Sequence, residues 1–226
     1  WYENDGSENF TEHIISTSEE HAISVYAIDV DGDGDMDVLS GSFQDDTIAW
    51  YENDGSENFT QYIITTSADG ARSVYAQDLD DDGDIDFLSA SQNDDTIAWY
   101  ENDGSGSFTE RVISTTADLA FQVYAEDVDG DGDMDVLSAS ANDDKIAWHE
   151  NDGNENFTEH VITNSVDWAI SVYAADIDND GDIDVLSSSM NDDKIAWYQN
   201  DGNENFIQHI ISSSADYAAS VYAEDI

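Results

Sequence analysis

Apolar and polar residues alternate with a period of two along most of the chain, and no segment keeps a helical period. The alternating runs are rich in Val, Ile, Tyr and Leu, as strands are. Four kinds of run occur: "SVYAIDV" (24–30), "MDVLSGS" (36–42), "TIAWYEN" (47–53) and "NFTEHIIS" (9–16). Asn-Asp-Gly separates the third kind from the fourth, and its glycine tolerates the positive φ of a tight turn. The pattern predicts short antiparallel strands joined by hairpins.

This four-strand unit recurs every 49 residues. "WYENDG" at Trp1 returns at Trp50 and Trp99, then as "WHENDG" at Trp148 and "WYQNDG" at Trp197. Four antiparallel strands in a unit of this length are typical of a β-propeller blade. A parallel β-solenoid is the alternative. It fits less well, because a solenoid coil is usually shorter and needs no two hairpin turns per unit.

We therefore predict an all-β fold in which residues 1–226 form one β-propeller fragment. Its four complete blades are expected at 22–66, 71–115, 120–164 and 169–213, with a partial blade of third and fourth strands at 1–17 and a lone first strand at 218–226. Asp225 stands where a fifth acidic stretch would begin. We expect a piece of a larger propeller, shaped as an open arc or as a ring that further residues complete. The two end strands make edge-to-edge self-association a hazard.

The composition narrows the possible functions. The 226 residues include 54 acidic and 4 basic ones, a formal net charge of −50, which excludes nucleic-acid binding through a basic face and disfavours anionic lipid. Hydrophobic residues at 39% supply enough material for a core. The chain has no cysteine, so it can form neither a disulfide nor a thiolate zinc site. No apolar run approaches the roughly 18 residues of a membrane span.

Carboxylates are concentrated in four acidic loops, each between a first and a second strand. The loops read "DVDGDGDMD" (29–37), "DLDDDGDID" (78–86), "DVDGDGDMD" (127–135) and "DIDNDGDID" (176–184). Carboxylates at loop positions 1, 3 and 5 converge when the loop coils, and glycine at position 6 permits the sharp turn. Position 7 offers its backbone carbonyl and position 9 another carboxylate. Such oxygen ligands suit Ca²⁺, and Mg²⁺ is the weaker candidate because it demands a compact octahedron.

The first half of each loop matches an EF-hand loop, but position 12 is Ser40 rather than Glu and strands flank the loop. A solvated acidic turn is the alternative, and four copies at fixed spacing disfavour it. Four calcium ions would reduce the charge of −50 to −42. The predicted calcium ligands are Asp29, Asp31, Asp33, Asp35, Asp37, Asp78, Asp80, Asp82, Asp84, Asp86, Asp127, Asp129, Asp131, Asp133, Asp135, Asp176, Asp178, Asp180, Asp182 and Asp184.

The unit formed by the first strand, the "DxDxDGDxD" loop and the second strand resembles the FG-GAP and VCBS repeats of bacterial surface proteins. It is also similar to the calcium-binding blades of integrin α-subunit propellers. The resemblance covers essentially the whole chain. It implies a propeller, calcium in the first hairpin of each blade and an extracellular or cell-surface role. The Phe-Gly and Gly-Ala-Pro signatures of FG-GAP repeats are absent, and the chain contains no proline, so the repeats stand nearer the VCBS type.

A second candidate surface lies on the face opposite the acidic loops, where otherwise similar repeats differ. One variable register lies before each first strand, and the other lies between the second and third strands. The first register holds His21, Gly70, Leu119, Trp168 and Tyr217, and the second Phe43, Gln92, Ala141 and Met190. Unconstrained loop tips would also vary in this way. We predict ligand-binding residues at His21, Phe43, Trp168, Met190 and Tyr217, with Trp168 and Tyr217 exposed for stacking on sugar rings or a protein partner.

Two other repeated positions point to structure rather than chemistry. The tryptophans at 1, 50, 99, 148 and 197 are expected in the core between blades rather than in a lectin pocket. His13, His160 and His209 share a register with Tyr62 and Arg111, which argues against a common histidine metal site.

The sequence thus favours a non-enzymatic, calcium-binding repeat domain of a secreted or cell-surface bacterial protein. Its expected role is adhesion or recognition of a carbohydrate or protein, without nucleic-acid binding or membrane insertion. An accessory or catalytic propeller of a polysaccharide-active extracellular enzyme is one alternative, and a structural spacer is another. Against catalysis, the sequence offers no Ser/His/Asp or Cys/His constellation, and nearly every carboxylate recurs in each blade.

Overall fold

The computed structural model describes residues 1–224, which form strands and turns without any helix. Each complete repeat folds into one four-stranded antiparallel sheet, as predicted. The sheets are β3(Ala22–Ile28), β4(Asp37–Ser42), β5(Thr47–Asn53) and β6(Phe59–Thr65); β7(Ala71–Gln77), β8(Asp86–Ser91), β9(Thr96–Asn102) and β10(Phe108–Ser114); β11(Ala120–Glu126), β12(Asp135–Ser140), β13(Lys145–Asn151) and β14(Phe157–Thr163); and β15(Ala169–Ala175), β16(Asp184–Ser189), β17(Lys194–Asn200) and β18(Phe206–Ser212). A short pair, β1(Tyr2–Asn4) and β2(Phe10–Glu12), precedes them.

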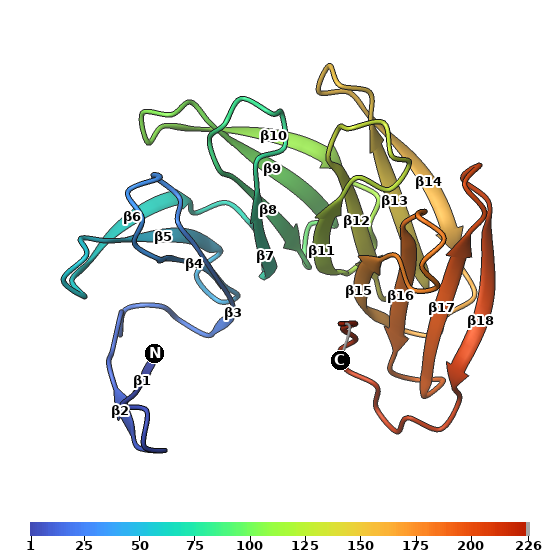
Figure 1. Cartoon of the computed structure of the whole chain (residues 1–226), viewed down its shortest axis with the longest axis horizontal. Helices are drawn as coiled ribbons and strands as arrows, with labels where there is room; N and C mark the ends of the chain where they lie inside the picture. Colours follow the sequence, from blue (N-terminus) through green and yellow to red (C-terminus); the bar gives the residue numbers. More distant parts are fainter. Residues whose placement is uncertain (225–226) are drawn as a thin grey trace.

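The sheets stand side by side in an open arc, and the two ends of the chain lie on either side of its gap (Figure 1). The predicted blades are therefore confirmed, and their sheets do not close into a ring within the described residues. Within each blade the strands pair in chain order. The acidic loops and the Asn-Asp-Gly turns consequently lie at one end of the sheets, and the remaining connections lie at the other.

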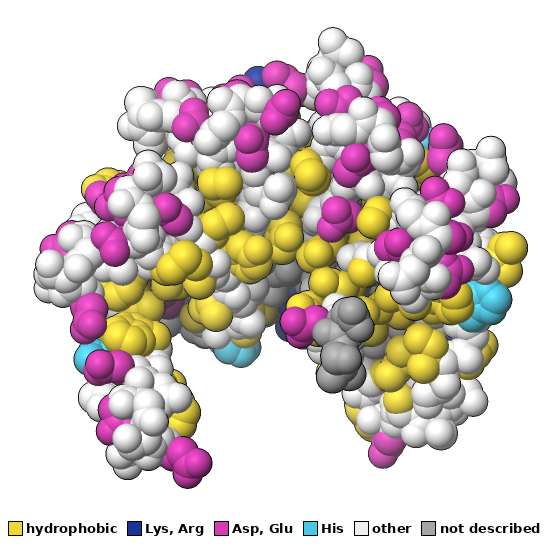
Figure 2. Space-filling view, in the orientation of Figure 1, with side chains coloured by type: hydrophobic (Ala, Val, Ile, Leu, Met, Phe, Trp, Pro, Cys, Tyr) yellow, Lys and Arg dark blue, Asp and Glu magenta, His cyan; other side chains and the backbone are white. Residues whose placement is uncertain are grey.

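The first strands of the blades lie along the inner side of the arc. Their repeated tyrosines form a continuous ladder of rings tilted by 46–55° to one another, with centroid distances of 4.8–4.9 Å between neighbours. The ladder runs through Tyr26, Tyr75, Tyr124, Tyr173 and Tyr222. Apolar side chains follow this inner side, whereas carboxylates gather over the loops (Figure 2).

Three hydrophobic clusters fill the three interfaces between complete blades. Trp50, Trp99 and Trp148 belong to these clusters and are 5%, 1% and 1% exposed. Each indole meets a phenylalanine of the following blade edge to face, as Trp148 meets Phe206 at 6.5 Å. The predicted core role is confirmed for these three. The prediction does not hold for the other two tryptophans: Trp1 is 41% exposed and Trp197 is half-buried, because neither lies between two complete blades.

Residues 218–224 follow the path of a first strand without forming one. The N–H of Val221 donates to Ser171 Oγ at 3.2 Å, as the N–H of Val74 donates to Ser24 Oγ at 3.1 Å between the first two complete blades. The described part of 218–226 has no strand assignment, because no second strand is present to pair with it. Asp225, expected to begin a fifth acidic loop, lies outside the described residues. Within residues 1–224 no helix is long and apolar enough to cross a bilayer.

Candidate functional site

Each acidic loop coils around its first aspartate. In the loop between β3 and β4, the two oxygens of Asp29 accept the N–H groups of Gly32 and Gly34, both at 2.9 Å. Asp31 and Asp33 then accept the N–H two residues onward, at 3.2 and 2.9 Å. The glycine at position 6 has φ between +96° and +103° in all four loops, a conformation that side chains rarely adopt. This explains why position 6 is always glycine.

The coiling brings three carboxylates of every loop to within 4.8 Å of one another. The groups are Asp29, Asp31 and Asp33; Asp78, Asp80 and Asp82; Asp127, Asp129 and Asp135; and Asp176, Asp178 and Asp184. Three like charges at this separation repel unless a cation or protons neutralise them. Residue type and geometry therefore fit a divalent metal with hard oxygen ligands.

The aspartate at position 9 is fully buried and connects the two hairpins of its blade. In the first blade, Asp37 Oδ2 accepts the N–H of Val30 and the indole N–H of Trp50, both at 3.1 Å, and Oδ1 accepts the N–H of Asn53 at 2.7 Å. The bond to the asparagine recurs in the other blades at 2.7–2.8 Å. Position 9 is thus a structural anchor as well as a candidate ligand, and in the last two loops its carboxylate joins the cluster.

Burial makes these carboxylates reluctant to ionise. Desolvation raises the pKa of Asp86 and of Asp135 to about 7, even though hydrogen bonds from Asn102 and Asn151 act in the opposite direction. Desolvation likewise raises the pKa of Asp80, with repulsion from Asp82 as the next cause. Buried acids that are costly to ionise alone are suited to a bound cation, which would favour their charged form.

The aspartate at position 7 turns its side chain away from the cluster. The carboxylate of Asp84 lies against Gly104 in the turn between β9 and β10, so closely that an added Cβ would clash with it. The same contact recurs with Asp35, Asp133 and Asp182. Asn-Asp-Gly therefore needs its glycine both for a φ of about +70° and for space. The predicted role of position 7 as a backbone ligand stays a prediction.

One further acidic group already has a positive partner. Asp80, Glu101 and Glu155 converge within 4.8 Å across the interface of the second and third blades. Arg111 pairs with Glu101 at 2.6 Å and with Glu155 at 2.8 Å. The guanidinium also lies 5.2 Å from the ring centre of Trp99, in the register where His160 stacks on Trp148. This group is best described as an ion-paired contact between blades.

On the opposite face, the two variable registers meet. The N–H of Met190 donates to the carbonyl of Trp168 at 3.0 Å, and that of Phe43 donates to the carbonyl of His21 at 3.1 Å. The other two complete blades repeat this bond with Gln92 and Ala141 as donors. His21 and Phe43 also contact ring to ring at 5.8 Å. The structure therefore joins residues that the sequence placed about 22 positions apart.

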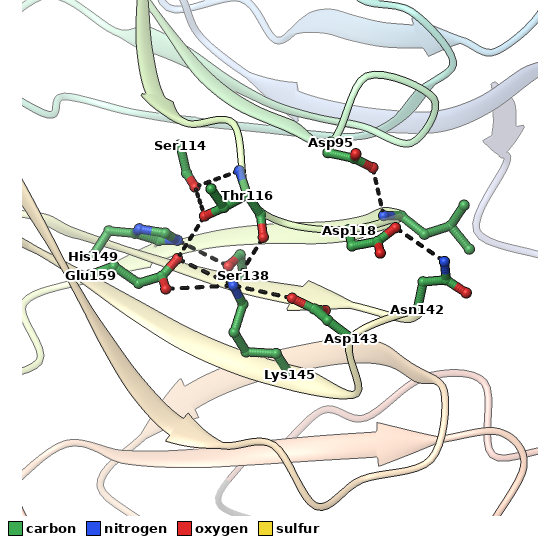
Figure 3. Close-up of polar contacts among 11 residues, drawn as sticks. Asp95, Ser114, Thr116, Asp118, Ser138, Asn142, Asp143, Lys145, His149 and Glu159 are labelled. Carbon is green, nitrogen blue, oxygen red and sulfur yellow. Dashed lines mark hydrogen bonds and ion pairs between the residues drawn. The ribbon is translucent and has the colours of Figure 1, made fainter.

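A carboxylate from the preceding blade fixes the backbone at the first of these registers. Asp144 Oδ1 accepts the N–H of Trp168 at 2.9 Å, and Asp95 Oδ1 accepts that of Leu119 at the same distance. Figure 3 shows the bond that Asp95 accepts from the backbone, beside the bond that Asn142 donates to Asp118 at 3.1 Å. The bound residues have positive φ, which costs an L-residue energy. The blade-to-blade bond therefore holds strained positions in place.

The predicted exposure of the aromatic residues is only partly correct. Tyr217 is 70% exposed, as expected. Trp168 is half-buried rather than exposed, because its ring lies edge-on to Phe121 at 6.4 Å. Phe121 belongs to a third variable register that the sequence reasoning missed: Ile23, Arg72, Phe121, Ile170 and Ala219. This register varies between near-identical repeats, and that variation could have identified it from the sequence.

A second missed feature is a buried Ser–His pair. His149 Nε2 and Ser138 Oγ lie 3.0 Å apart, and both residues are about 1% exposed. His149 occupies the register of Tyr51, Tyr100 and Tyr198, and Tyr100 and Tyr198 approach the equivalent serines at 3.3 Å. Nearby, Lys145 pairs with Asp143 at 3.2 Å and Glu159 at 3.3 Å (Figure 3). The Ser138–His149 pair takes the place of the Ser–Tyr contact of other blades, and its burial leaves no access for a substrate.

Solved structures with similar folds share little sequence with this chain. A protein from Lactobacillus plantarum has a TM-score of 0.63 at 13% identity, with 92% of this chain and 60% of that one covered. A candidate 6-phosphogluconolactonase from Bacteroides uniformis has 0.58 at 11%, covering 95% and 61%. An Agrocybe aegerita lectin specific for non-reducing terminal N-acetylglucosamine has only 0.44 at 14%, covering 96% and 75%. At these identities the likeness to the first two proteins shows the fold alone, and the chain spans about three fifths of each.

No curated protein sequence matches the chain. The model of the FG-GAP-like repeat matches it five times, at residues 1–40, 29–89, 78–138, 127–187 and 176–226. These segments overlap in the acidic loops, so each match contains the loop whose geometry is described above. The nearer likeness to the VCBS type stays a prediction. The repeat matches, the blades and the loops agree: this chain belongs to the family of FG-GAP-like repeat proteins.

Proposed function

We propose that the four acidic loops bind calcium and that the ions stabilise a recognition domain. The observation that carries the proposal is the convergence of three carboxylates within 4.8 Å in every loop. The proposed ligands are the aspartates at positions 1, 3, 5 and 9, with the backbone carbonyl at position 7. A bound calcium ion would neutralise the repulsion between these converging carboxylates. Because position 9 also holds the third strand, binding would stabilise the whole blade.

An extracellular setting suits such sites. Oxygen-ligand calcium sites of extracellular modules work at dissociation constants of about 10⁻⁴–10⁻³ M, at which cytosolic calcium would leave them empty. The net charge of −50 also disfavours a compact state without bound cations or salt. We therefore infer a secreted or cell-surface protein.

We further propose that the face opposite the acidic loops recognises a carbohydrate. Its variable residues are joined by backbone bonds and fixed from the neighbouring blade, as at Trp168. Side chains that differ on a rigid, repeated backbone form a surface whose specificity can change without cost to the fold. Aromatic rings at this face can stack on sugar rings. A protein ligand and a purely structural spacer are the alternative outcomes of the test below.

The proposed role is non-catalytic. The Ser138–His149 pair is buried, and nearly every carboxylate recurs in each blade. An accessory role within a polysaccharide-active enzyme is compatible with the same sugar-binding face, since binding would then deliver the enzyme to its substrate.

Calorimetric titration and thermal unfolding test calcium binding directly. Calcium should bind to four loops and raise the melting temperature, with magnesium far less effective. At a hundredfold excess over Kd, each independent site should add about 2.7 kcal/mol. An unchanged melting temperature after complete chelation would contradict the proposal.

A glycan array read beside an array of extracellular proteins tests recognition. Binding to glycans should weaken for Trp168→Ala and survive for Trp99→Phe, a change in the core between blades. Binding to proteins alone would replace the carbohydrate proposal, and no binding on either array would favour the spacer.

A further inference from the structure

Arg72 stands apart from the other three cations of the chain. Arg111 pairs with Glu101 and Glu155, and Lys145 with Asp143 and Glu159. Lys194 pairs with Asp192. Arg72 forms no ion pair and no side-chain hydrogen bond with any group of residues 1–224, although the chain has 54 acidic residues. An arginine without a carboxylate partner in so acidic a protein needs an explanation.

The guanidinium of Arg72 is held in place by an aromatic ring. It lies 4.1 Å from the ring centre of Phe121, a cation–π distance, and Phe121 in turn meets Trp168 at 6.4 Å. Desolvation lowers the pKa of Arg72, and no carboxylate acts on it in the opposite direction. Phe121 covers one face of the guanidinium, and the N–H groups at the edge of the guanidinium have no partner among the described residues.

A β-bulge directs this side chain toward the inner side of the arc. In the ladder between β7 and β8, Ala71 pairs with Ser91 and Ser73 with Ala90, which leaves Arg72 as the extra residue. Phe121 and Ile170 occupy the bulges of the next two blades. Bulges commonly re-aim side chains next to functional sites. Ile23 occupies the same bulge in the first blade, so all four complete blades direct their variable residue to a shared place.

That place is a cavity of about 310 Å³, lined by ten residues that include Arg72, Phe121 and Met190. No lining residue is acidic. By contrast, four other cavities of the described chain each include at least one carboxylate and no lysine or arginine. The cavity volume lies at the lower end of small-molecule sites and suits one or two sugar rings.

The other polar groups of the cavity can serve hydroxyl groups. Ser73 Oγ accepts the N–H of Val123 at 3.4 Å, and Ser171 Oγ accepts that of Val221 at 3.2 Å. Each hydroxyl therefore keeps its own hydrogen to donate. Gln122 lies between them on β11. The cavity thus offers one guanidinium, two hydroxyl groups and an aromatic ring. This set suits a sugar with an acid group better than it suits an acidic peptide.

We propose that this cavity binds a uronic-acid residue of an acidic glycan, with the sugar carboxylate received by the guanidinium of Arg72. The proposal rests on the proposed carbohydrate recognition and names its ligand class. A planar carboxylate matches the arginine fork and can accept two parallel N–H bonds. The negative charge of the whole protein opposes approach, but salt screens charges beyond about 8 Å at physiological ionic strength. Among the residues that line the cavity, only Arg72 carries a charge.

Calorimetry with trigalacturonate and its methyl ester tests the proposal, at physiological ionic strength and fixed calcium. The ester keeps the sugar rings and removes the charge. The wild-type chain should bind the acid about 10- to 100-fold more tightly than the ester, as expected for bonds to a charged group. N-acetylglutamate is the peptide-like probe, and it should bind at least tenfold more weakly than trigalacturonate.

Variants chosen from the repeat itself keep the fold intact. Arg72→Ile places the residue that β3 and β15 carry in this register, and it should abolish the preference for the acid. Arg72→Lys keeps the charge but loses the planar guanidinium, so this variant should retain only part of the preference for the acid. Lys194→Thr, with the residue of β5 and β9, removes a paired charge and should change nothing. Melting temperatures check that each variant is folded.

The possible failures are distinguishable. Equal binding of acid and ester, or a preference that survives Arg72→Ile, overturns the uronate proposal while carbohydrate recognition stands. N-acetylglutamate binding as tightly as trigalacturonate overturns the sugar assignment of the cavity. If no glycan binds, acidic or neutral, both the proposed function and this inference fail.

Discussion

The carboxylate of Asp86 accepts the backbone N–H of Asn102 at 2.7 Å and so joins an acidic loop to the turn between β9 and β10. Its second oxygen accepts the N–H of Leu79 at 3.0 Å. A buried side chain therefore closes both hairpins of its blade. The candidate calcium ligand and the structural anchor are the same residue, so metal binding and blade stability should be coupled.

Asp86→Asn should destabilise the chain even without calcium. The new amide group would point a donor at a backbone N–H, and leaving a buried partner unsatisfied costs roughly 1–3 kcal/mol. Asp82→Asn is the matched control, because Asp82 is exposed and accepts only the N–H of Asp84 within the loop. Urea unfolding in a chelator should separate the two variants, whereas both should lose calcium affinity. Equal stability in the chelator would show that Asp86 is not an anchor.

Gly104→Ala should destabilise the chain more than Gly106→Ala does. Both glycines have positive φ, +70° and +79°. A Cβ at Gly104 would meet the carboxylate of Asp84, whereas at Gly106 its nearest neighbour is Trp50 Cζ3 at 4.0 Å. We expect about 1 kcal/mol for the conformation in each case and a further 1–3 kcal/mol from overpacking at Gly104. Unfolding midpoints measure the difference, and the double variant with Asp84→Ala should recover the overpacking part.

His149→Tyr should remove an acid sensitivity. Burial lowers the pKa of His149 to about 4, whereas its ordinary value is 6.5. The unfolded chain therefore takes up a proton that the folded chain refuses, and stability contributed by the neutral ring is lost as pH falls from about 6.5 to about 4. At pH 5 the loss should be about 2 kcal/mol. Tyrosine fits this register in the other blades, so the variant should match wild type at pH 8 and exceed it at pH 5.

The reference point for this pH series is pH 8, which lies above both the folded and the ordinary pKa of His149, so the variant and wild type should be equally stable there. Buried carboxylates with raised pKa values give a slope of opposite sign between about pH 4 and 7. The informative quantity is therefore the difference between His149→Tyr and wild type, measured in a fixed calcium concentration. A difference independent of pH would contradict the assignment.

Trp148→Ala and Trp1→Ala should differ although both residues share one register of the repeat. Trp148 is 1% exposed and fills the interface of the last two blades, so its loss should cost about 3–5 kcal/mol. Trp1 is 41% exposed, and its loss should change stability by less than about 0.5 kcal/mol. Chemical denaturation checks both values. A large effect at Trp1 would mean that the short β1–β2 sheet contributes to the cooperative fold.

The sequence by itself determined the strands, the turns and the acidic loops of this protein. Each depends on residues close together in the chain: the alternation in "TIAWYEN", the glycine of Asn-Asp-Gly, and the spacing of aspartates from Asp29 to Asp37. The 49-residue repeat then multiplied the signal, so the blade could be recognised before any contact was known. Inter-blade tryptophans followed from the same repetition.

Only the tertiary structure decided what happens between distant segments. It placed Asp86 on Asn102, Met190 on Trp168, and Arg72 on Phe121 in a cavity without acids. It also half-buried Trp168, which sequence reasoning had placed in solvent. Strand periodicity says which side of a sheet a residue faces. Which neighbour fills that side depends on how successive blades pack around the arc, and a bulge or a buried carboxylate changes that outcome without changing the pattern.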